Sequence, residues 1–492
     1  MDSYPIFEQR SSNRRAKKIV LPRFVLTEVA DAVDPEATRV ASSLEPYYCR
    51  PKLVPAEGKR RDGKPNWVNH QFNLFPVILD ATGAPWAEAV VYLLSRLENS
   101  LAPSLATYAA IAEDLAAYRQ FLDEYEIEWT DFPIQKLQRP TYRFNGHLKH
   151  AVTTGEIAAA TAKRRMGSVI TFYRWLESEE VLKPAEPPWR ESDRYVQFID
   201  VHGFRRSKTV VTTDLSIRIP REHDPYDGFI EDGGKLRPLT LEEQEWLLDA
   251  LISLGNTEMT LIHLLSLLTG ARIQTTLTFR LRHALLKLEA CQQGDLRFPV
   301  GHGTGVDTKR EKQIVLHIPI WFYQMLQTYA RSVRAERRRE RAAGGDHENQ
   351  YLFLSQRGAP FYQGKRETLS FDSSLQLRHR KCGQGVRQFI TERVIPFIRA
   401  KHRTRTFRYQ FHDIRATAGM NWTDHQLRLV ELGRSTLHQA REFVKTRLSH
   451  ESAATTDRYL QYRHNAKFTR WAEEKHETHL RALCERAMER LR

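Results

Sequence analysis

One histidine–arginine pair in the sequence is set apart by its apolar surroundings. An arginine follows three residues after five histidines: His202, His402, His412, His425 and His438. Chance alone gives about two such pairs in a chain this rich in both residues, so the spacing by itself indicates no site. His412 and Arg415, however, lie in FHDIRATA, where apolar and small neighbours predict the buried start of a helix. A buried histidine and arginine could bind an anion and move a proton. Taken alone, they are more simply a structural pair.

A second pattern joins a histidine to a tyrosine. His450 begins HESAATTDRY, which places Tyr459 nine residues later, and of the 19 histidines it alone has a tyrosine at this offset. A tyrosine hydroxyl can act as a nucleophile in covalent catalysis. Tyr462 is a rival nucleophile three residues further on, and tyrosines on helices commonly fill cores. The offset favours Tyr459.

Two further cations follow predicted turns. Arg272 comes two residues after Gly270, a glycine suited to the end of a helix. Lys309 opens a basic turn before a predicted strand, QIVLHIPI. Arg272 alone would be an ordinary surface arginine, and Arg310 and Lys312 share the turn of Lys309. Phosphodiester chemistry without a metal needs a nucleophile, cations for the phosphate oxygens and an acid for the leaving oxygen, and these residue types supply all three.

The charge of the chain favours a polyanionic partner. Among 492 residues, Lys and Arg number 75 against 60 Asp and Glu, a formal net charge of +15. With 41% hydrophobic and 27% charged residues, the composition is that of a globular protein and excludes disordered or collagenous classes. The sequence contains no Walker loop, no H-E-x-x-H and no zinc-type cysteine spacing. We expect neither a metal nor a cofactor.

In their order along the chain, these motifs resemble the tyrosine recombinases, the phage-integrase-like site-specific recombinases. The resemblance covers residues 237 to about 465 through five elements: LTGARI at Arg272, the Lys309 turn, LFLSQRGAP from Leu352, FHDIR at His412, and LSH followed by TTDRY at Tyr459. It covers residues 80–185 weakly, as the basic helical core-binding domain that such enzymes carry.

The resemblance implies that Tyr459 attacks the scissile phosphate of DNA, which gives a 3′-phosphotyrosyl link and a free 5′-hydroxyl. Arg272 and Arg415 would stabilise the non-bridging oxygens, where forked arginine side chains are most useful. Because the covalent link conserves the energy of the broken bond, the resemblance implies neither ATP nor metal.

The resemblance also implies roles for three other residues. Lys309 would protonate the leaving 5′-oxygen, His412 would act as general base or hydrogen-bonding partner, and His450 would hydrogen-bond the phosphate. Two features depart from the family pattern. Thr275 stands three residues after the first arginine, where many relatives have an acidic residue. The support that this acid usually gives to the active site must therefore come from another residue. The 38-residue interval between His412 and His450 is also long, which predicts an added helix or loop.

We expect a mainly α fold with a small β-sheet (α+β), in five segments. They are a basic arm or small arm domain (1–80), a helical, SAM-like core-binding domain (81–185), an extended interdomain connector (186–236), an integrase-type catalytic domain (237–465) and a C-terminal helix (466–492). Apolar residues with a 3.6-residue period predict a helix from Ser104 to Tyr125. The C-terminal helix is either internal core or, as the family suggests, a contact between subunits.

Basic residues in the first two segments are the predicted DNA contacts. They are Lys163, Arg164 and Arg165 in the helical region, and Arg14, Arg15, Lys17 and Lys18 in the arm. Basic runs are common at chain ends, so a solvated tail is an even alternative for the arm. Contacts with many phosphates predict a steep salt dependence of binding.

The expected function is that of an enzyme that breaks and rejoins double-stranded DNA as a dimer or tetramer, with element-encoded or host accessory proteins. One alternative is a non-catalytic DNA-binding protein that retains the fold, which Thr275 mildly favours. Another is a type IB topoisomerase or a telomere resolvase. The first residues, MDSYPIFEQR, contain no apolar targeting segment, and no apolar stretch reaches membrane-spanning length, so we expect a cytoplasmic protein without a membrane partner.

Overall fold

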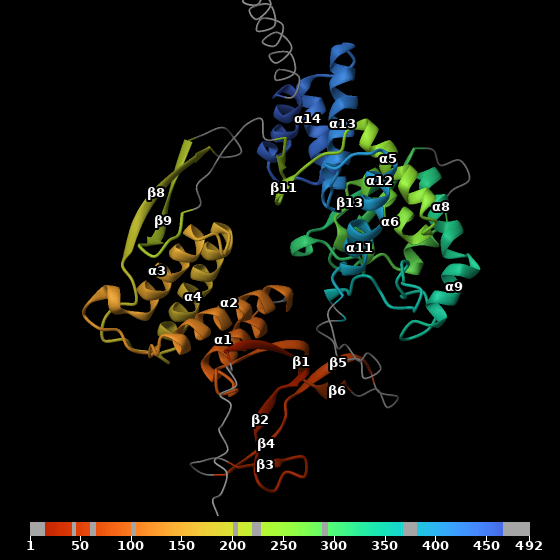
Figure 1. The fold of residues 1–492 in the computed structure, drawn as a ribbon. Helices are drawn as coiled ribbons and strands as arrows, with labels where there is room; N and C mark the ends of the chain where they lie inside the picture. The colour runs from red at the N-terminus through yellow and green to blue at the C-terminus, as the bar shows by residue number, and fades with distance from the viewer. Residues whose placement is uncertain are drawn as a thin grey trace, which may run out of the picture. The chain divides into compact units, whose positions relative to one another are not determined.

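The protein is mainly α-helical and contains several small sheets (Figure 1). The structure is a computed structural model that describes residues 15–41, 46–59, 65–99, 105–199, 205–218, 228–287, 294–365, 367 and 381–465. All strand pairs in these residues are antiparallel. The predicted fold class is confirmed. The chain divides into two compact units, Met1–Arg221 with Lys365–His379 and Glu222–Gly364 with Arg380–Arg492.

Short strands occupy most of the region that the sequence predicted as a basic arm. They are β1 (Lys17–Val25), β2 (Thr27–Val29), β3 (Thr38–Val40), β4 (Tyr47–Pro51), β5 (Leu53–Lys59), β6 (Pro65–Asn69) and β7 (Gln71–Leu79). Strand β7 pairs with β1 and is buried on both faces, so it lacks the apolar–polar alternation that would have revealed it. Phe72, Phe75 and Ile78 of β7 share one hydrophobic core with the helices that follow. This part of the chain therefore belongs to the core of the first unit.

Helices form the rest of that core. They are α1 (Ala87–Glu98), α2 (Leu105–Glu124), the 3-10 turn η1 (Lys136–Gln138), α3 (Pro140–Thr153) and α4 (Ala159–Ser178). The predicted face of α2 is buried from Leu105 to Leu122, whereas Tyr125 lies beyond the helix and is exposed. The buried hydroxyls of Tyr118 on α2 and Tyr173 on α4 are 2.7 Å apart, which joins the two longest helices of this unit by a hydrogen bond.

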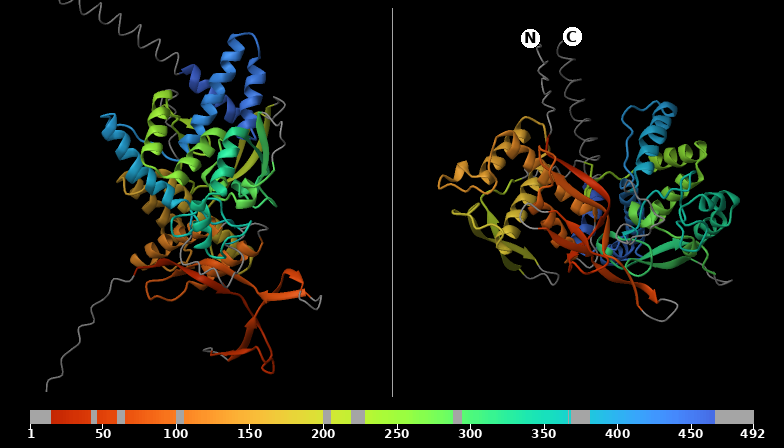
Figure 2. Two further views of the ribbon diagram at one scale, coloured as in Figure 1. Left: turned by 90° about the vertical axis from the view of Figure 1, so that its right-hand side faces the viewer. Right: turned by 90° about the horizontal axis from the view of Figure 1, so that it is seen from below.

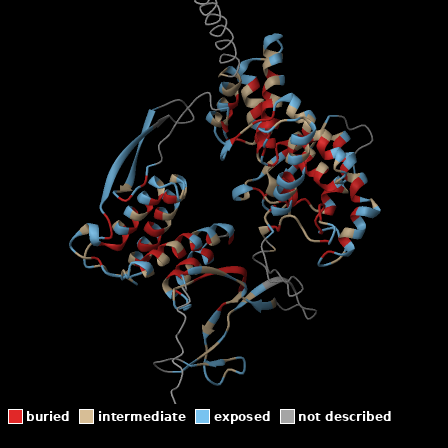
Figure 3. Ribbon diagram, in the orientation of Figure 1, coloured by how far each residue is buried: buried red, intermediate tan, exposed pale blue. Residues whose placement is uncertain are grey.

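A hairpin interrupts the segment that was expected to be an extended connector. Its strands are β8 (Glu191–Ile199) and β9 (Arg205–Thr213), and most of its described side chains are exposed (Figure 3). Strand β9 ends at Thr213, and Leu215 and Ile217 beyond it are buried in the core of the first unit.

The second unit begins with a short hairpin, whose two strands have two residues each, and two helices. The strands are β10 (Ile230–Glu231) and β11 (Lys235–Leu236), followed by α5 (Leu241–Ser253) and α6 (Thr257–Thr269). A capping box begins α5, since Thr240 and Glu243 each hydrogen-bond the backbone of the other. Helix α6 ends at Gly270, whose φ of 64° lies in the left-handed region that ends many helices. Arg272 is thereby placed at the start of the next helix.

The remaining elements surround this pair of helices. They are α7 (Ile273–Leu277), η2 (Leu281–Ala284), β12 (Asp295–Val300), η3 (Lys309–Glu311), β13 (Ile314–Pro319), α8 (Ile320–Ala330), α9 (Val333–Glu340), α11 (Gln384–Phe389), the π-helical η4 (Ile390–Val394), α12 (Ile395–Lys401), α13 (Asp413–Glu431), α14 (Leu437–Leu448) and a last helix at 453–465. Strand β13 confirms the predicted strand, and it pairs with β12.

Helix α13 is the central helix of the site. It packs against α6 and α14, and the left-hand view of Figure 2 shows the two blue helices α13 and α14 next to each other. Small residues on its buried face, Ala416, Ala418 and Gly419, allow this close packing. The long interval between the two histidines is filled by the second half of α13 and by α14, so the predicted addition is helical.

A buried histidine in α6 makes the stability of the second unit dependent on pH. His263 is hydrogen-bonded to the Met259 carbonyl at 2.6 Å and to the Tyr409 hydroxyl at 3.1 Å, and burial lowers its pKa to about 4. Between pH 4 and its unfolded-state pKa near 6.5, the unfolded chain binds this proton and the folded chain does not. Acidification through this range should therefore favour unfolding.

We expect the urea midpoint of α6 to fall between pH 7.5 and pH 5.5, and to fall less in His263→Gln. Samples equilibrated at each pH would be pulse-labelled by hydrogen exchange at one common pH, and α6 peptides would be read by mass spectrometry. Equal shifts in the variant and the unmodified chain would contradict the assignment.

Candidate active site

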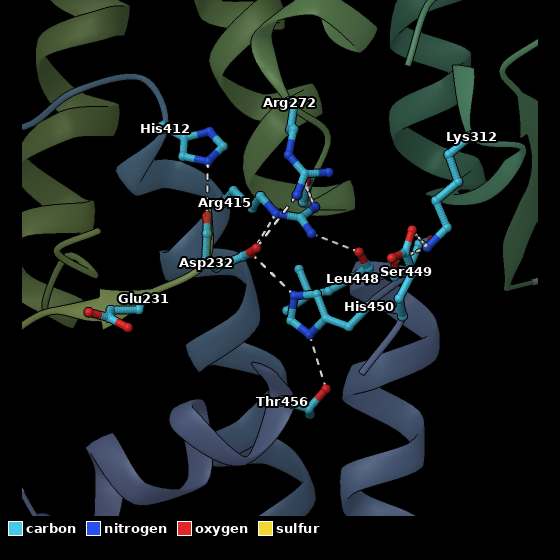
Figure 4. A network of polar contacts seen from close by, with 12 residues as sticks. Glu231, Asp232, Arg272, Lys312, His412, Arg415, Leu448, Ser449, His450 and Thr456 are labelled. Carbon is cyan, nitrogen blue, oxygen red and sulfur yellow. Dashed lines mark hydrogen bonds and ion pairs between the residues drawn. The ribbon is translucent and has the colours of Figure 1, made fainter. Parts of the chain in front are cut away.

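Five of the six predicted catalytic residues meet around Asp232, four of them at its carboxylate and His412 at its backbone carbonyl. They come from four separate places in the second unit: Arg272 at the start of α7, His412 and Arg415 at the start of α13, His450 directly after α14, and Tyr459 in the helix at 453–465. Figure 4 shows most of this network. Asp232 itself lies in the turn between β10 and β11 and is 4% exposed.

Arg415 is fixed by three hydrogen bonds and is buried. Its Nε donates to Asp232 Oδ2 at 2.8 Å, its Nη1 to the Gly270 carbonyl at 2.7 Å and its Nη2 to the Leu448 carbonyl at 2.7 Å. Gly270 and Leu448 stand at the C-terminal ends of α6 and α14, where the helix dipoles present partial negative charge. Two helix ends and one carboxylate therefore hold the guanidinium in a single orientation.

Arg272 is held less tightly. Its side chain is 27% exposed, and its Nη2 lies 3.5 Å from Asp232 Oδ1. Its Nε is buried and has no hydrogen-bond partner among the described residues. Burial and the neighbouring charge of Arg415 lower its pKa to about 10, so the group stays charged near neutrality. Arg272 thus retains donor capacity for a further anion oxygen.

The contacts of His450 determine its tautomer. Its Nε2 lies 3.2 Å from Asp232 Oδ2, and its Nδ1 lies 3.0 Å from Thr456 Oγ1. An ionised carboxylate can only accept, so Nε2 carries the proton. Burial lowers the pKa of His450, so the ring is neutral and Nδ1 accepts from the Thr456 hydroxyl. Thr456 thereby aims the Nε2 proton at the anion.

Tyr459 is buried, with 0% exposure, and its hydroxyl donates to Asp232 Oδ2 at 3.1 Å. Burial and the negative charge of Asp232 raise its pKa well above the usual value, so the hydroxyl is protonated in this state. The rival Tyr462 is only partly buried, against the apolar cluster that contains Met420 and Leu448. The structure therefore places Tyr459 on the anion site.

His412 contacts the backbone of the same turn. Its Nε2 lies 3.4 Å from the Asp232 carbonyl oxygen. Burial and the charges of Arg415 and Arg272 lower its pKa to about 4. The imidazole is therefore neutral near pH 7 and free to accept a proton once its surroundings change.

Lys309, the sixth predicted residue, lies at the edge of the site. It is exposed, and its Nζ lies 3.4 Å from the position that a Cβ on Gly233 would take, beside the turn that carries Asp232. Lys312 lies nearby, where its Nζ donates to the Ser449 carbonyl at 3.0 Å and pairs with Glu451 at 3.4 Å. Both lysines line one small pocket with Arg272 and Arg415.

The sequence did not point to Asp232 or Thr456. Asp232 lies in the segment expected to be a connector, and its one visible signal is the Gly233–Gly234 pair that follows it. Thr456 was visible only as part of TTDRY. Thr275, at the position where the resemblance implies an acidic residue, is buried. The carboxylate that contacts the arginines belongs instead to Asp232, in a hairpin about 40 residues earlier in the sequence.

The predicted DNA contacts belong to the first unit. Lys17, Arg15 and Lys163 are exposed. Lys18 pairs with Glu113 at 2.5 Å, and Arg164 pairs with the buried Asp114 at 2.6 Å, which restrains both cations. Arg165 has a buried Nε without a hydrogen-bond partner in the described residues. Arg14 and the C-terminal helix predicted at 466–492 lie outside the described residues.

The site is a carboxylate surrounded by cationic and neutral donors, with a tyrosine hydroxyl among them, on a mainly α framework. Solved structures that resemble the chain include integrases. A lambda integrase dimer bound to a COC′ core site has 15% sequence identity, covering 75% of this chain and 94% of that chain at a TM-score of 0.39. A Tn1549 transposon integrase in complex with circular intermediate DNA has 12% identity, with the same two coverages and a TM-score of 0.40. A lambda integrase tetramer bound to a Holliday junction has 14% identity, covering 75% of this chain and 76% of that chain at a TM-score of 0.38. No protein-family model matches the chain, and no curated protein matches its sequence.

The described residues contain no group of three or more His, Cys, Asp and Glu that could hold a metal ion. Their helices include none that is both long and apolar enough to cross a membrane.

The close approach of α13 to the tyrosine predicts an unusual effect of a glycine substitution. A Cβ on Gly419 would lie 2.4 Å from Tyr459 Cε1 and 2.9 Å from Leu448 Cδ1. Replacing a helix-interior glycine with alanine ordinarily stabilises a protein by about 0.5–1 kcal/mol. Here the tyrosine ring must shift, so Gly419→Ala should lower the thermal unfolding midpoint.

Gly167→Ala on α4 is the matched control, because a Cβ there would meet nothing within 4 Å. We expect its unfolding midpoint to stay equal or to rise. Equal stabilisation by both substitutions would contradict the packing of Tyr459 on Gly419.

Proposed function

We propose that the chain is a site-specific DNA recombinase of the integrase type, which cleaves and rejoins DNA through a covalent bond to Tyr459. One observation supports this above all. The Tyr459 hydroxyl, both arginines and the His450 Nε2 proton converge on a single carboxylate. A nucleophile and three donors around one anion are what a phosphodiester requires for attack at phosphorus.

The proposed reaction exchanges one phosphoester for another. The Tyr459 oxygen attacks the scissile phosphorus and forms a tyrosyl–phosphate bond, while the bond from phosphorus to the 5′-oxygen breaks. Arg272 and Arg415 stabilise the negative charge that develops on the non-bridging oxygens. Neutral His412 accepts the tyrosine proton, and Lys309 gives a proton to the leaving 5′-oxygen. A 5′-hydroxyl from another strand reverses these steps and completes the rejoining.

The rest of the proposal concerns binding and assembly. The net charge of +15 and the exposed cations of the first unit, Arg15, Lys17 and Lys163, would bind the phosphate backbone of a duplex without reading its sequence. Recombination joins ends from more than one cleavage, so we propose that the enzyme acts as a homo-oligomer on DNA.

The nucleophile can be tested with two phenylalanine variants. Tyr459→Phe keeps the ring and removes the attacking oxygen, so it should bind DNA and form no covalent protein–DNA adduct. The substrate would be a nicked suicide duplex whose cleaved end diffuses away, and adducts would be resolved on a denaturing gel. Tyr462→Phe is the matched control and should form the adduct. An adduct from Tyr459→Phe would move the nucleophile elsewhere.

The acid can be identified through the leaving group. Lys309→Ala should slow cleavage of ordinary DNA by about 10²–10⁴-fold, the usual contribution of a general acid. A substrate with sulfur at the bridging 5′-position should restore the rate, because a thiolate leaves without a proton. Lys312→Ala is the matched control. If the sulfur substrate restored the cleavage rate of Lys312→Ala but not that of Lys309→Ala, the general acid would be Lys312.

A further inference from the structure

We propose that the carboxylate of Asp232 stands in for the scissile phosphate while no DNA is bound, and that DNA must displace it before cleavage. This inference rests on the proposed function, since it assumes that the site binds a phosphodiester. It assigns to Asp232 a role as an internal competitor of the substrate.

The first argument is the pattern of donors. Asp232 Oδ2 accepts from Arg415 Nε, His450 Nε2 and the Tyr459 hydroxyl at 2.8, 3.2 and 3.1 Å, and Oδ1 faces Arg272 Nη2 at 3.5 Å. The two carboxylate oxygens thus take the donors that two non-bridging phosphate oxygens would take.

The second argument is charge. A carboxylate and a phosphodiester each carry one negative charge, so their exchange leaves the charge of the site unchanged. Burial alone would raise the pKa of Asp232, but the hydrogen bond from His450 and the charge of Arg415 hold it far below its usual value. Asp232 therefore remains an anion near neutral pH, and within the described part of the chain it is the counter-ion of the buried Arg415 and the partly buried Arg272.

The third argument is space. Asp232 is 4% exposed, and its carboxylate lies 3.1 Å from the Tyr459 hydroxyl. Tyr459 is 0% exposed. A phosphodiester cannot reach the tyrosine oxygen while the carboxylate occupies its place.

The turn that carries Asp232 is built so that it can move. Its strands β10 and β11 have only two residue pairs, and Gly233 and Gly234 follow the aspartate. Glycine adopts many backbone conformations at low energetic cost, so the backbone of this turn can change conformation easily. Glu231, on the same turn, points away from the site in Figure 4 and pairs with Arg458 at 3.6 Å. Its side chain is 61% exposed, which makes it a matched control.

Inorganic phosphate is the first probe, because it needs no cleavage. Asp232→Ala and Asp232→Asn should bind phosphate about tenfold or more tightly than the unmodified chain, the magnitude of one hydrogen bond to an ionised group. Calorimetry would give the affinities, and phosphate should raise the thermal midpoint of these variants more than that of the unmodified chain. Glu231→Gln should behave like the unmodified chain. Phosphate affinities that are equal in all four proteins would overturn the proposal.

DNA cleavage gives the second test. Asp232→Asn should form the covalent adduct at lower concentrations of a short suicide duplex, with an undiminished rate at saturation. A slower rate at saturation would show that the carboxylate serves the chemistry itself and would overturn the proposal. If the unmodified chain forms no adduct at all, the proposed function fails, while the phosphate measurement still decides the role of Asp232.

A third measurement uses the unmodified chain, so it still tests the proposal if the Asp232 variants fail to fold. In this structure the Asp232 amide donates to the Gly234 carbonyl at 3.1 Å. Binding of an uncleavable duplex should accelerate hydrogen exchange at residues 230–236 by breaking this turn. Unchanged exchange in the DNA complex would contradict displacement.

Discussion

The buried guanidinium of Arg415 is the constraint on which the rest of the site depends. A cation inside a protein is costly unless every donor finds an acceptor, and here the acceptors come from three segments. The Gly270 and Leu448 carbonyls lie at the C-terminal ends of two helices, and Asp232 directly follows a short strand. Satisfying one side chain therefore fixes where α6, α14 and the β10–β11 turn meet. Arg272 follows the first of these helix ends, and His450 follows the second.

This dependence explains why the two histidines are neutral. Placing both close to two arginines and away from water lowers their pKa values. A neutral imidazole can accept or donate one proton, and the environment decides which. The proton of His450 is directed by Thr456, whereas His412 lies 3.4 Å from the Asp232 carbonyl oxygen. Two similar side chains thereby acquire different chemistry from their neighbours.

Much of the site could be predicted from the sequence because its residues sit at helix ends with local signals. Gly270 marks the end of α6 before Arg272, and apolar neighbours mark the start of α13 at His412. Asp232 could not be predicted, because its partners are 40 to 227 residues away and nothing local requires an acid there. Strand β7 was missed for a related reason: burial on both faces removes the alternation that reveals strands.

One contact ties the nucleophile to the turn that covers the site. Arg458, which immediately precedes Tyr459, donates to the Glu231 carbonyl at 2.6 Å, and Glu231 immediately precedes Asp232. In the displacement proposed for Asp232, movement of the turn would therefore also act on the residue next to the tyrosine. A recombinase of the proposed kind must not react with other phosphoesters or let water hydrolyse its covalent intermediate. The same movement that admits the DNA backbone would release the hydroxyl for attack, so that the protein without DNA stays inactive.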